Sequence, residues 1–180
     1  MKLTRSRTDV VNKAAELAVE YEAADGGCAQ CTFLAIVDAL RWGGAEIITP
    51  EVEDALYPGI SLLTAGIGLT GQGSCGALTG SVMATGMAFA AMRGETGRDI
   101  KSFGDSCDMV RNVIMAHFDE KYRSLRCLDV QLGHFGKAWE FRRQDMTEEF
   151  LAITDGCVIK EIATLTVGAI CDELERQQTR

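Results

Sequence analysis

The sequence lacks several features that would place it in a common functional class. Its opening residues, MKLTRSRTDVV, contain no apolar stretch of the kind that a secretory signal needs. It also lacks an excess of positive charge, since 26 acidic residues outnumber 18 basic ones and the net charge is −8. We therefore expect a cytoplasmic protein whose main partner is neither nucleic acid nor an anionic membrane.

Charged residues are absent from Ala55 to Met92. This run is too rich in Gly, Ser and Thr for a simple membrane span, and its helical part, residues 76–92, lies at the short edge of what crosses a bilayer. We expect that helix to be buried in the protein core instead. It carries small residues at every fourth position: Gly76, Gly80, Ala84 and Ala88. This stripe predicts close packing of a second helix.

The chain also lacks an internal repeat, a linker and any alternation of strands with helices. Hydrophobic periodicity and capping residues predict helices near residues 8–24, 28–42, 50–57, 75–94, 99–121 and 147–177, the last interrupted at Asp155-Gly156. We expect the first helix to be capped at Thr8 or Asp9 and the third to end at Pro58-Gly59. Residues 122–144 have an irregular pattern. The predicted fold is a single all-α domain over residues 1–180, a helical bundle with a long glycine-rich connection before its central helix.

The predicted helix near residues 99–121 is amphipathic. Its expected inward face consists of Met109, Val113, Ala116 and Phe118.

The glycine-rich segment GIGLTGQGSCGALTG, residues 66–80, contains the pattern G-x-G-x-x-G twice. In a dinucleotide-binding protein this pattern joins a strand to a helix inside a βαβ unit. The flanking segments here are predicted to be helices, so no parallel sheet can hold such a unit. The pattern therefore favours a run dense in glycine over a phosphate-binding loop.

Seven cysteines stand out in a chain for which we expect a reducing compartment. Several cysteines in that setting indicate metal or redox chemistry more than structural disulfides. Cys28, Cys75 and Cys157 stand near predicted helix starts, where unpaired N–H groups lower the pKa of a thiol. Cys127 lacks that setting but follows Arg123 and Arg126. About three of the seven, Cys107 and Cys171 foremost, are expected to be buried thiols.

Common cysteine and histidine motifs fit poorly. Cys28-x-x-Cys31 has neither the preceding strand of a thioredoxin nor the second nearby pair of a zinc knuckle. No C-x-x-C-H sequence is present, which excludes covalent c-type haem. His117 and His134 stand alone among apolar neighbours and lack ligand spacing, so we expect them to be packed or surface residues.

Four segments resemble, in order, a family of redox-active proteins named for the cysteine signature C_GCAxxG_C_C. They are GCAQ at 27–30, GQGSCGALTG at 71–80, FDEKYRSLRCLDV at 118–130 and DGCVIKEIA at 155–163. Mapped residue by residue, the signature falls on Cys28, Cys75, Cys127 and Cys157. The central block reads Ser-Cys-Gly-Ala-x-x-Gly here, a departure from Gly-Cys-Ala-x-x-Gly.

The resemblance implies an α-helical, redox-linked protein that carries an iron–sulfur cluster. The leading hypothesis is an electron-transfer protein or small subunit in which Cys28, Cys75, Cys127 and Cys157 ligate one cluster, with a redox protein as partner and a homodimer or larger complex as assembly. One alternative is cluster-free thiol–disulfide exchange, with Cys28 and Cys31 or Cys75 and Cys127 as the pair. A second alternative is a non-catalytic accessory subunit. No nucleophile–base pair or phosphate loop indicates a catalytic reaction of its own.

Overall fold

The computed structural model describes residues 1–154 and 157–178, apart from the side chains of Asp25 and Cys157. Its helices, one of them a short π-helix (η1), follow in this order: α1 Arg7–Asp25, α2 Cys28–Trp42, α3 Pro50–Ser61, α4 Gly76–Met92, α5 Phe103–Met109, η1 Val110–Met115, α6 Ala116–Tyr122, α7 Cys127–Phe135, α8 Gln144–Ile153 and α9 Cys157–Gln178. These ranges contain no strand, and the all-α bundle with a long glycine-rich connection before α4 is confirmed. The expected interruption at Asp155-Gly156 lies outside the described residues.

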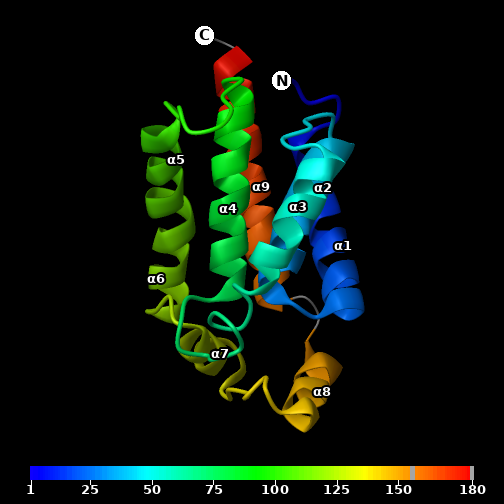
Figure 1. Ribbon diagram of the computed structural model, residues 1–180, viewed down its shortest axis with the longest axis vertical. Coiled ribbons are helices and arrows are strands. Elements are labelled where there is room, and N and C mark those ends of the chain that lie inside the picture. Colours follow the sequence, from blue (N-terminus) through cyan, green and yellow to red (C-terminus); the bar gives the residue numbers. More distant parts are fainter. Residues whose placement is uncertain (155–156, 179–180) are drawn as a thin grey trace.

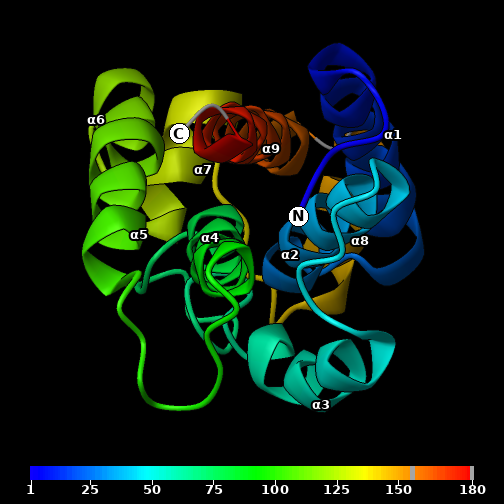
Figure 2. The ribbon, with the colours of Figure 1, turned by 90° about the horizontal axis from the view of Figure 1, so that it is seen from above.

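Four helices form the centre of the bundle. α9 packs against α1, α2 and α4, and α2 in turn packs against α1 and α4. Seen from above, α5 and α6 stand along one flank and α3 lies on another side (Figure 2). α7 and α8 lie at one end of the bundle, at the bottom of Figure 1. Within the described ranges, no helix combines the length and the apolar character that crossing a bilayer requires.

The small-residue stripe of α4 is the surface that α2 approaches. A Cβ atom at Gly80 would lie 2.2 Å from the carbonyl oxygen of Ala29, so only glycine permits this contact. Ala84 and Ala88, farther along the stripe, are fully buried in the main core cluster. The predicted close packing is confirmed, and it sets the distance between the starts of α2 and α4.

Several predicted helix ends are displaced, those of α1 and α3 among them. α1 begins at Arg7 because Ser6, and neither Thr8 nor Asp9, is the N-cap, and its hydroxyl accepts the N–H of Asp9 at 3.2 Å. The prediction that Pro58-Gly59 ends the third helix is wrong, since α3 continues to Ser61. Pro58 is exposed, so the carbonyl that its missing N–H leaves free can bond to water. The buried side chain of Ile60 holds the last turn in place.

The inward face of the predicted helix at 99–121 is shifted. The segment consists of α5, η1 and α6, and a π-helix has a wider turn than an α-helix. Ile114 and Phe118 are fully buried, whereas Ala116 is exposed. The wider turn rotates the residues that follow relative to the α-helical register, so the prediction is wrong for Ala116. Phe118 is buried as expected, and Met109 packs against the main core cluster.

Residues 122–144 are not irregular throughout. α7 forms within them and ends at Gly136, which has a left-handed φ of 69°. α7 has only nine residues and contains Gly133, so its periodicity is too short to stand out in the sequence. This helix buries Cys127, Val130 and Gln131, and the correction therefore bears directly on the cysteines.

Candidate functional site

The signature cysteines all stand where helices begin. Cys28 is the first residue of α2, Cys75 is the N-cap of α4, Cys127 is the first residue of α7 and Cys157 is the first residue of α9. The sequence predicted a helix start near Cys28, Cys75 and Cys157. The start of α7 at Cys127 was not predicted. Each cysteine is therefore next to backbone N–H groups that have no partner inside the helix.

Three of these cysteines line one cavity of about 450 Å³. Cys28 comes from α2, Cys75 from the start of α4 and Cys127 from α7. Val158 and Ile159 line the same cavity, so the first turn of α9 adjoins it. The side chain of Cys157 lies outside the described residues, and its position relative to the other three is a prediction that the described residues do not test.

Backbone hydrogen bonds hold Cys75 and Cys127 against each other. The N–H of Cys75 donates to the carbonyl of Leu125 at 2.8 Å, and the N–H of Cys127 donates to the carbonyl of Gly73 at 2.9 Å. These contacts flank an isolated antiparallel β-bridge between Ser74 and Arg126. The glycine-rich connection is thus tied to the segment that precedes α7, and this places the two thiols in one cavity.

Glycine lets the backbone approach the sulfur atoms. A Cβ atom at Gly76 would lie 2.1 Å from the Sγ of Cys28, and one at Gly66 would lie 3.0 Å from the Cβ of Cys127. Gly66 also has a φ of 73°, in the left-handed region. No larger residue fits at Gly76 without moving Cys28 or the start of α2.

The connection near Cys28 is a left-handed turn that includes side-chain-bearing residues. Ala65, Ile67 and Leu69 have φ values of 50°, 64° and 62°, and Gly66 and Gly68 between them are also positive. A left-handed conformation costs about 1–2 kcal/mol for each residue with a side chain. Backbone strain of this kind gathers at functional sites, because the rest of the fold must hold it.

N–H groups donate to the sulfur atoms of Cys28 and Cys127. The backbone N–H of Ala65 donates to the Sγ of Cys28 at 3.3 Å, and the Nε2 of Gln131 donates to the Sγ of Cys127 at 3.2 Å. The Gln131 amide is itself oriented, since its Oε1 accepts a hydrogen bond from the backbone N–H of Trp139 at 2.8 Å. Both donors favour a sulfur atom that carries negative charge.

Burial, however, raises the pKa of the three thiols that line the cavity, those of Cys28, Cys75 and Cys127. Desolvation raises the pKa of Cys127 to about 12, and the nearby Cys28 adds to the rise while Gln131 opposes it. Desolvation likewise raises the pKa of Cys28, against the Ala65 N–H, and raises that of Cys75 well above its usual range, with Cys28 and Cys127 adding to it. The low pKa expected for Cys28 and Cys75 at helix starts is wrong, because the loss of water outweighs the effect of the helix N-terminus. A nearby cation would be needed to ionise these thiols near neutral pH.

The other described cysteines lie elsewhere. Cys31 and Cys171 are fully buried in the main core cluster, and Cys107 is half-buried on α5. Cys28, Cys75, Cys107, Cys127 and Cys171 are free thiols. Cys31 and Cys171 thus behave as the buried hydrophobic residues that free cysteine often is.

Neither histidine lines the cavity. His117 forms a hydrogen bond with Glu161 of α9, and the Nδ1 of His134 lies 3.5 Å from the hydroxyl of Tyr122. In the described part of the chain, no group of three or more His, Cys, Asp or Glu side chains is arranged to hold one metal ion.

Several cavity residues escape sequence reasoning. Phe135, Phe141 and Phe150 line it from α7, α8 and the segment between them, and Gln30 and Glu22 line it from α2 and α1. Gln131 could have been noticed because it follows Cys127 by four residues, one turn of the helix that was not predicted. The aromatic residues carry no comparable signal, since only the tertiary fold brings them to the cysteines.

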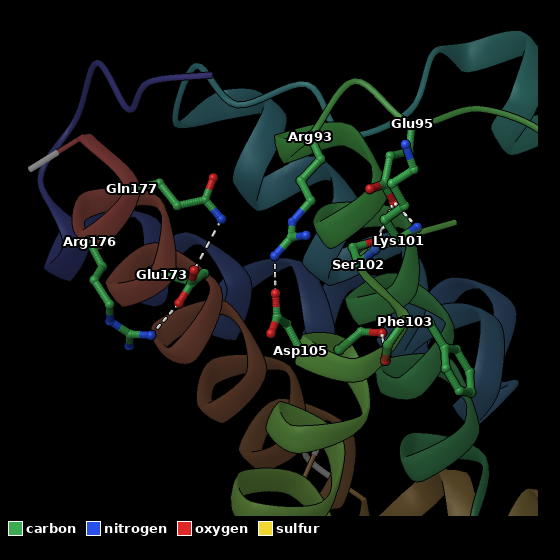
Figure 3. Close-up of polar contacts among 10 residues, drawn as sticks. Arg93, Glu95, Lys101, Ser102, Phe103, Asp105, Glu173, Arg176 and Gln177 are labelled. Carbon is green, nitrogen blue, oxygen red and sulfur yellow. Dashed lines mark hydrogen bonds and ion pairs between the residues drawn. The ribbon is translucent and has the colours of Figure 1, made fainter. Parts of the chain in front are cut away.

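A second hollow, of about 510 Å³, lies at the opposite end of the bundle. Its lining charges are largely paired with one another: Arg93 with Asp105, and Arg176 with Glu173, which also accepts an amide N–H of Gln177 at 3.0 Å (Figure 3). Such mutual pairing leaves little charge for a ligand. The cysteine-lined cavity is therefore the stronger candidate for the functional site.

The fold and the cavity define an all-α protein that gathers cysteines from the starts of separate helices around one cavity. Residues 27–167 match the family model described as "Putative redox-active protein (C_GCAxxG_C_C)", and the chain belongs to this family. Comparison with curated proteins and with solved structures found no match.

Proposed function

We propose that this redox-active family member is an electron-transfer protein or small subunit that holds one iron–sulfur cluster, with Cys28, Cys75, Cys127 and Cys157 as the ligands. The observation that carries the proposal is that three of these cysteines, far apart in sequence, line one cavity which the first turn of the Cys157 helix adjoins. Four cysteine thiolates are the usual ligands of such a cluster.

The residues present fit a cluster better than a single ion. The thiols of Cys28, Cys75 and Cys127 line part of a cavity of about 450 Å³ and do not converge on one point. A cluster spreads its ligands over several iron atoms, whereas a single zinc ion draws four ligands to about 2.3 Å. When bound, a cluster would supply one-electron redox chemistry and the positive charge that these buried thiols need to ionise.

The chain's own residues would tune that chemistry. The N–H of Ala65 and the amide of Gln131 already donate to ligand sulfur atoms. Hydrogen bonds to sulfur and exclusion of water both set the reduction potential of a cluster. A redox protein would be the electron partner, and a homodimer or a larger complex would be the assembly.

The test is anaerobic purification followed by analysis of iron, acid-labile sulfide and the visible spectrum. We expect both elements in the native chain, loss of both in C75S, and retention in C107S, a matched control because Cys107 lies outside the cavity. A colourless, metal-free chain that reconstitution with iron and sulfide leaves unchanged would contradict the proposal.

A second candidate function is cluster-free thiol–disulfide exchange. Cys75 and Cys127 favour it, since both line the same cavity and could form a disulfide. Cys31 is fully buried in the main core cluster, which makes Cys28–Cys31 the weaker pair. Mass mapping of the cluster-free chain after mild oxidation tests this function. One dominant and reversible Cys75–Cys127 bond would support it, and a scatter of pairings would count against it.

A further inference from the structure

The cysteine-lined cavity holds more than the thiols. Its volume of about 450 Å³ falls within the range of about 300–1,000 Å³ that is typical of small-molecule sites. The three cysteines occupy only part of its wall. The rest is mainly apolar and includes three aromatic rings and three exposed leucines: Phe135, Phe141, Phe150, Leu62, Leu69 and Leu151.

The aromatic part of the wall is a packed cluster. The ring of Phe150 lies edge-to-face against those of Phe135 and Phe141, with centroids 5.5 and 5.1 Å apart. Trp139 packs against Phe135 and Phe150 at 5.2 and 5.3 Å. Such a cluster offers a flat ring both apolar contact and further edge-to-face contacts.

The charge of the wall selects against anions. Among the described residues that line the cavity, Glu22 is the one charged side chain, and it is 3 % exposed. No lysine or arginine of that described set is present to bind a phosphate or carboxylate. An uncharged ligand avoids both the cost of desolvating an anion and the repulsion by Glu22.

Gln30 is a polar residue of the wall that can orient a ligand. Gln30 lines the cavity and is 8 % exposed, and its Oε1 accepts the hydroxyl of Thr64 at 2.7 Å. With the amide oriented in this way Nε2 is its donor end, and within the described residues no hydrogen bond from the Gln30 Nε2 is present. The Nε2 keeps accessible surface in the cavity, so it can donate there to water or, in its place, to a ligand carbonyl.

We propose that this cavity binds an uncharged aromatic or quinonoid ring compound that carries a carbonyl group, with the ring against Phe135 and Phe150 and the carbonyl accepting from Gln30. The inference rests on the proposed function in taking the cysteine cavity as the redox site, and it names the class of small molecule that reaches that site. The binding itself uses residues other than the signature cysteines.

Tetramethyl-1,4-benzoquinone is a suitable probe because its fully substituted ring does not add thiols. Its binding to the full chain is measured by equilibrium dialysis, with and without reconstituted cluster. Quenching of Trp139 fluorescence in the W42F background, where Trp139 is the remaining tryptophan, locates the probe beside the aromatic wall. Anthraquinone-2-sulfonate, an anionic quinone, is the control ligand.

We expect the neutral quinone to bind and to quench Trp139, and the sulfonate to bind at least tenfold more weakly. Q30L should weaken neutral-quinone binding about fivefold, the effect of one lost hydrogen bond. Q30E keeps an acceptor for Thr64 but replaces the donor by a carboxylate, so it should weaken binding more than Q30L does. Q177L, at the far end of the bundle, should leave binding unchanged. Circular dichroism confirms that each variant is folded.

The inference is overturned if the folded chain does not bind the neutral quinone, if Q30L and Q30E bind it as well as the native chain, or if the sulfonate binds equally well. Loss of binding on cluster loading also overturns it, because the cluster would then fill the cavity. Gln30-dependent binding in a chain that never takes up iron would instead defeat the proposed function and leave this inference standing.

Discussion

At the scale of single residues, the site is built on conformations that side chains disfavour. Ile67 is β-branched and has a φ of 64°, in the left-handed region. Ile67 is 49 % exposed, so the burial of its side chain offsets little of the strain energy. We expect I67G to raise the free energy of unfolding by about 1 kcal/mol, because glycine adopts this conformation without steric cost.

Urea unfolding of the cluster-free chain checks this expectation. V82G is the matched control, since Val82 is similarly exposed but lies inside α4. Glycine there should lower the stability by roughly 0.5–1 kcal/mol. A loss of stability in both variants would show that the left-handed turn is not strained at Ile67.

At the scale of elements, the start of α4 against α2 is the contact that positions the thiols. G76A would place a methyl group 2.1 Å from the Sγ of Cys28 and 2.9 Å from the backbone nitrogen of Ala29. The backbone atom cannot move without shifting α2, so we expect a loss of about 1–3 kcal/mol in stability and weaker cluster retention. Urea unfolding and iron content measure the two effects.

The same helix provides the control for this substitution. Gly86 also lies within α4, and a Cβ atom there would contact nothing within 4 Å. G86A should stabilise the chain by about 0.5–1 kcal/mol, because alanine is the better helix former. If G76A and G86A changed stability alike, the close approach of α4 to Cys28 would not limit the site.

Helices were predictable from the sequence where apolar periodicity and caps agreed over several turns. α2 matches its prediction from Cys28 to Trp42, and the start of α4 matches near Cys75. α7 was missed because nine residues give too short a pattern, and the shifted face at Ile114 depends on a π-helix that no local signal marks. Tertiary contacts decide both features.

For the cysteines, too, some features were predictable from the sequence and others depend on the tertiary fold. Their order and neighbours in sequence matched a family signature, and the structure brings Cys28, Cys75 and Cys127 to one cavity. The direction of the pKa shift was predicted wrongly for Cys28 and Cys75, because a helix start is visible in sequence whereas the depth of burial is not. The aromatic wall and Gln30 likewise depend on which segments the fold places together.

At the scale of the whole molecule, the site collects residues from helices that span most of the chain, so folding and site formation are one process.

Burying the thiols without a cation makes the stability of the cluster-free chain depend on pH. A thiol in the unfolded chain ionises near its usual pKa of 9.0, whereas the pKa of folded Cys127 is about 12. Between these values the folded state keeps a proton that the unfolded state has lost, and stability falls as pH rises.

We therefore expect the free energy of unfolding of the cluster-free chain to be flat with respect to these thiols below about pH 9 and to fall above it. The slope from Cys127 alone approaches about 1.4 kcal/mol per pH unit between the two pKa values. Urea unfolding at about pH 8 and about pH 10 measures the loss, and C127A should lose about 1 kcal/mol less over that interval. Equal losses in the native chain and C127A would mean that Cys127 ionises as readily in the fold as out of it. Iron–sulfur loading should flatten the dependence, since a metal-bound thiolate has already released its proton.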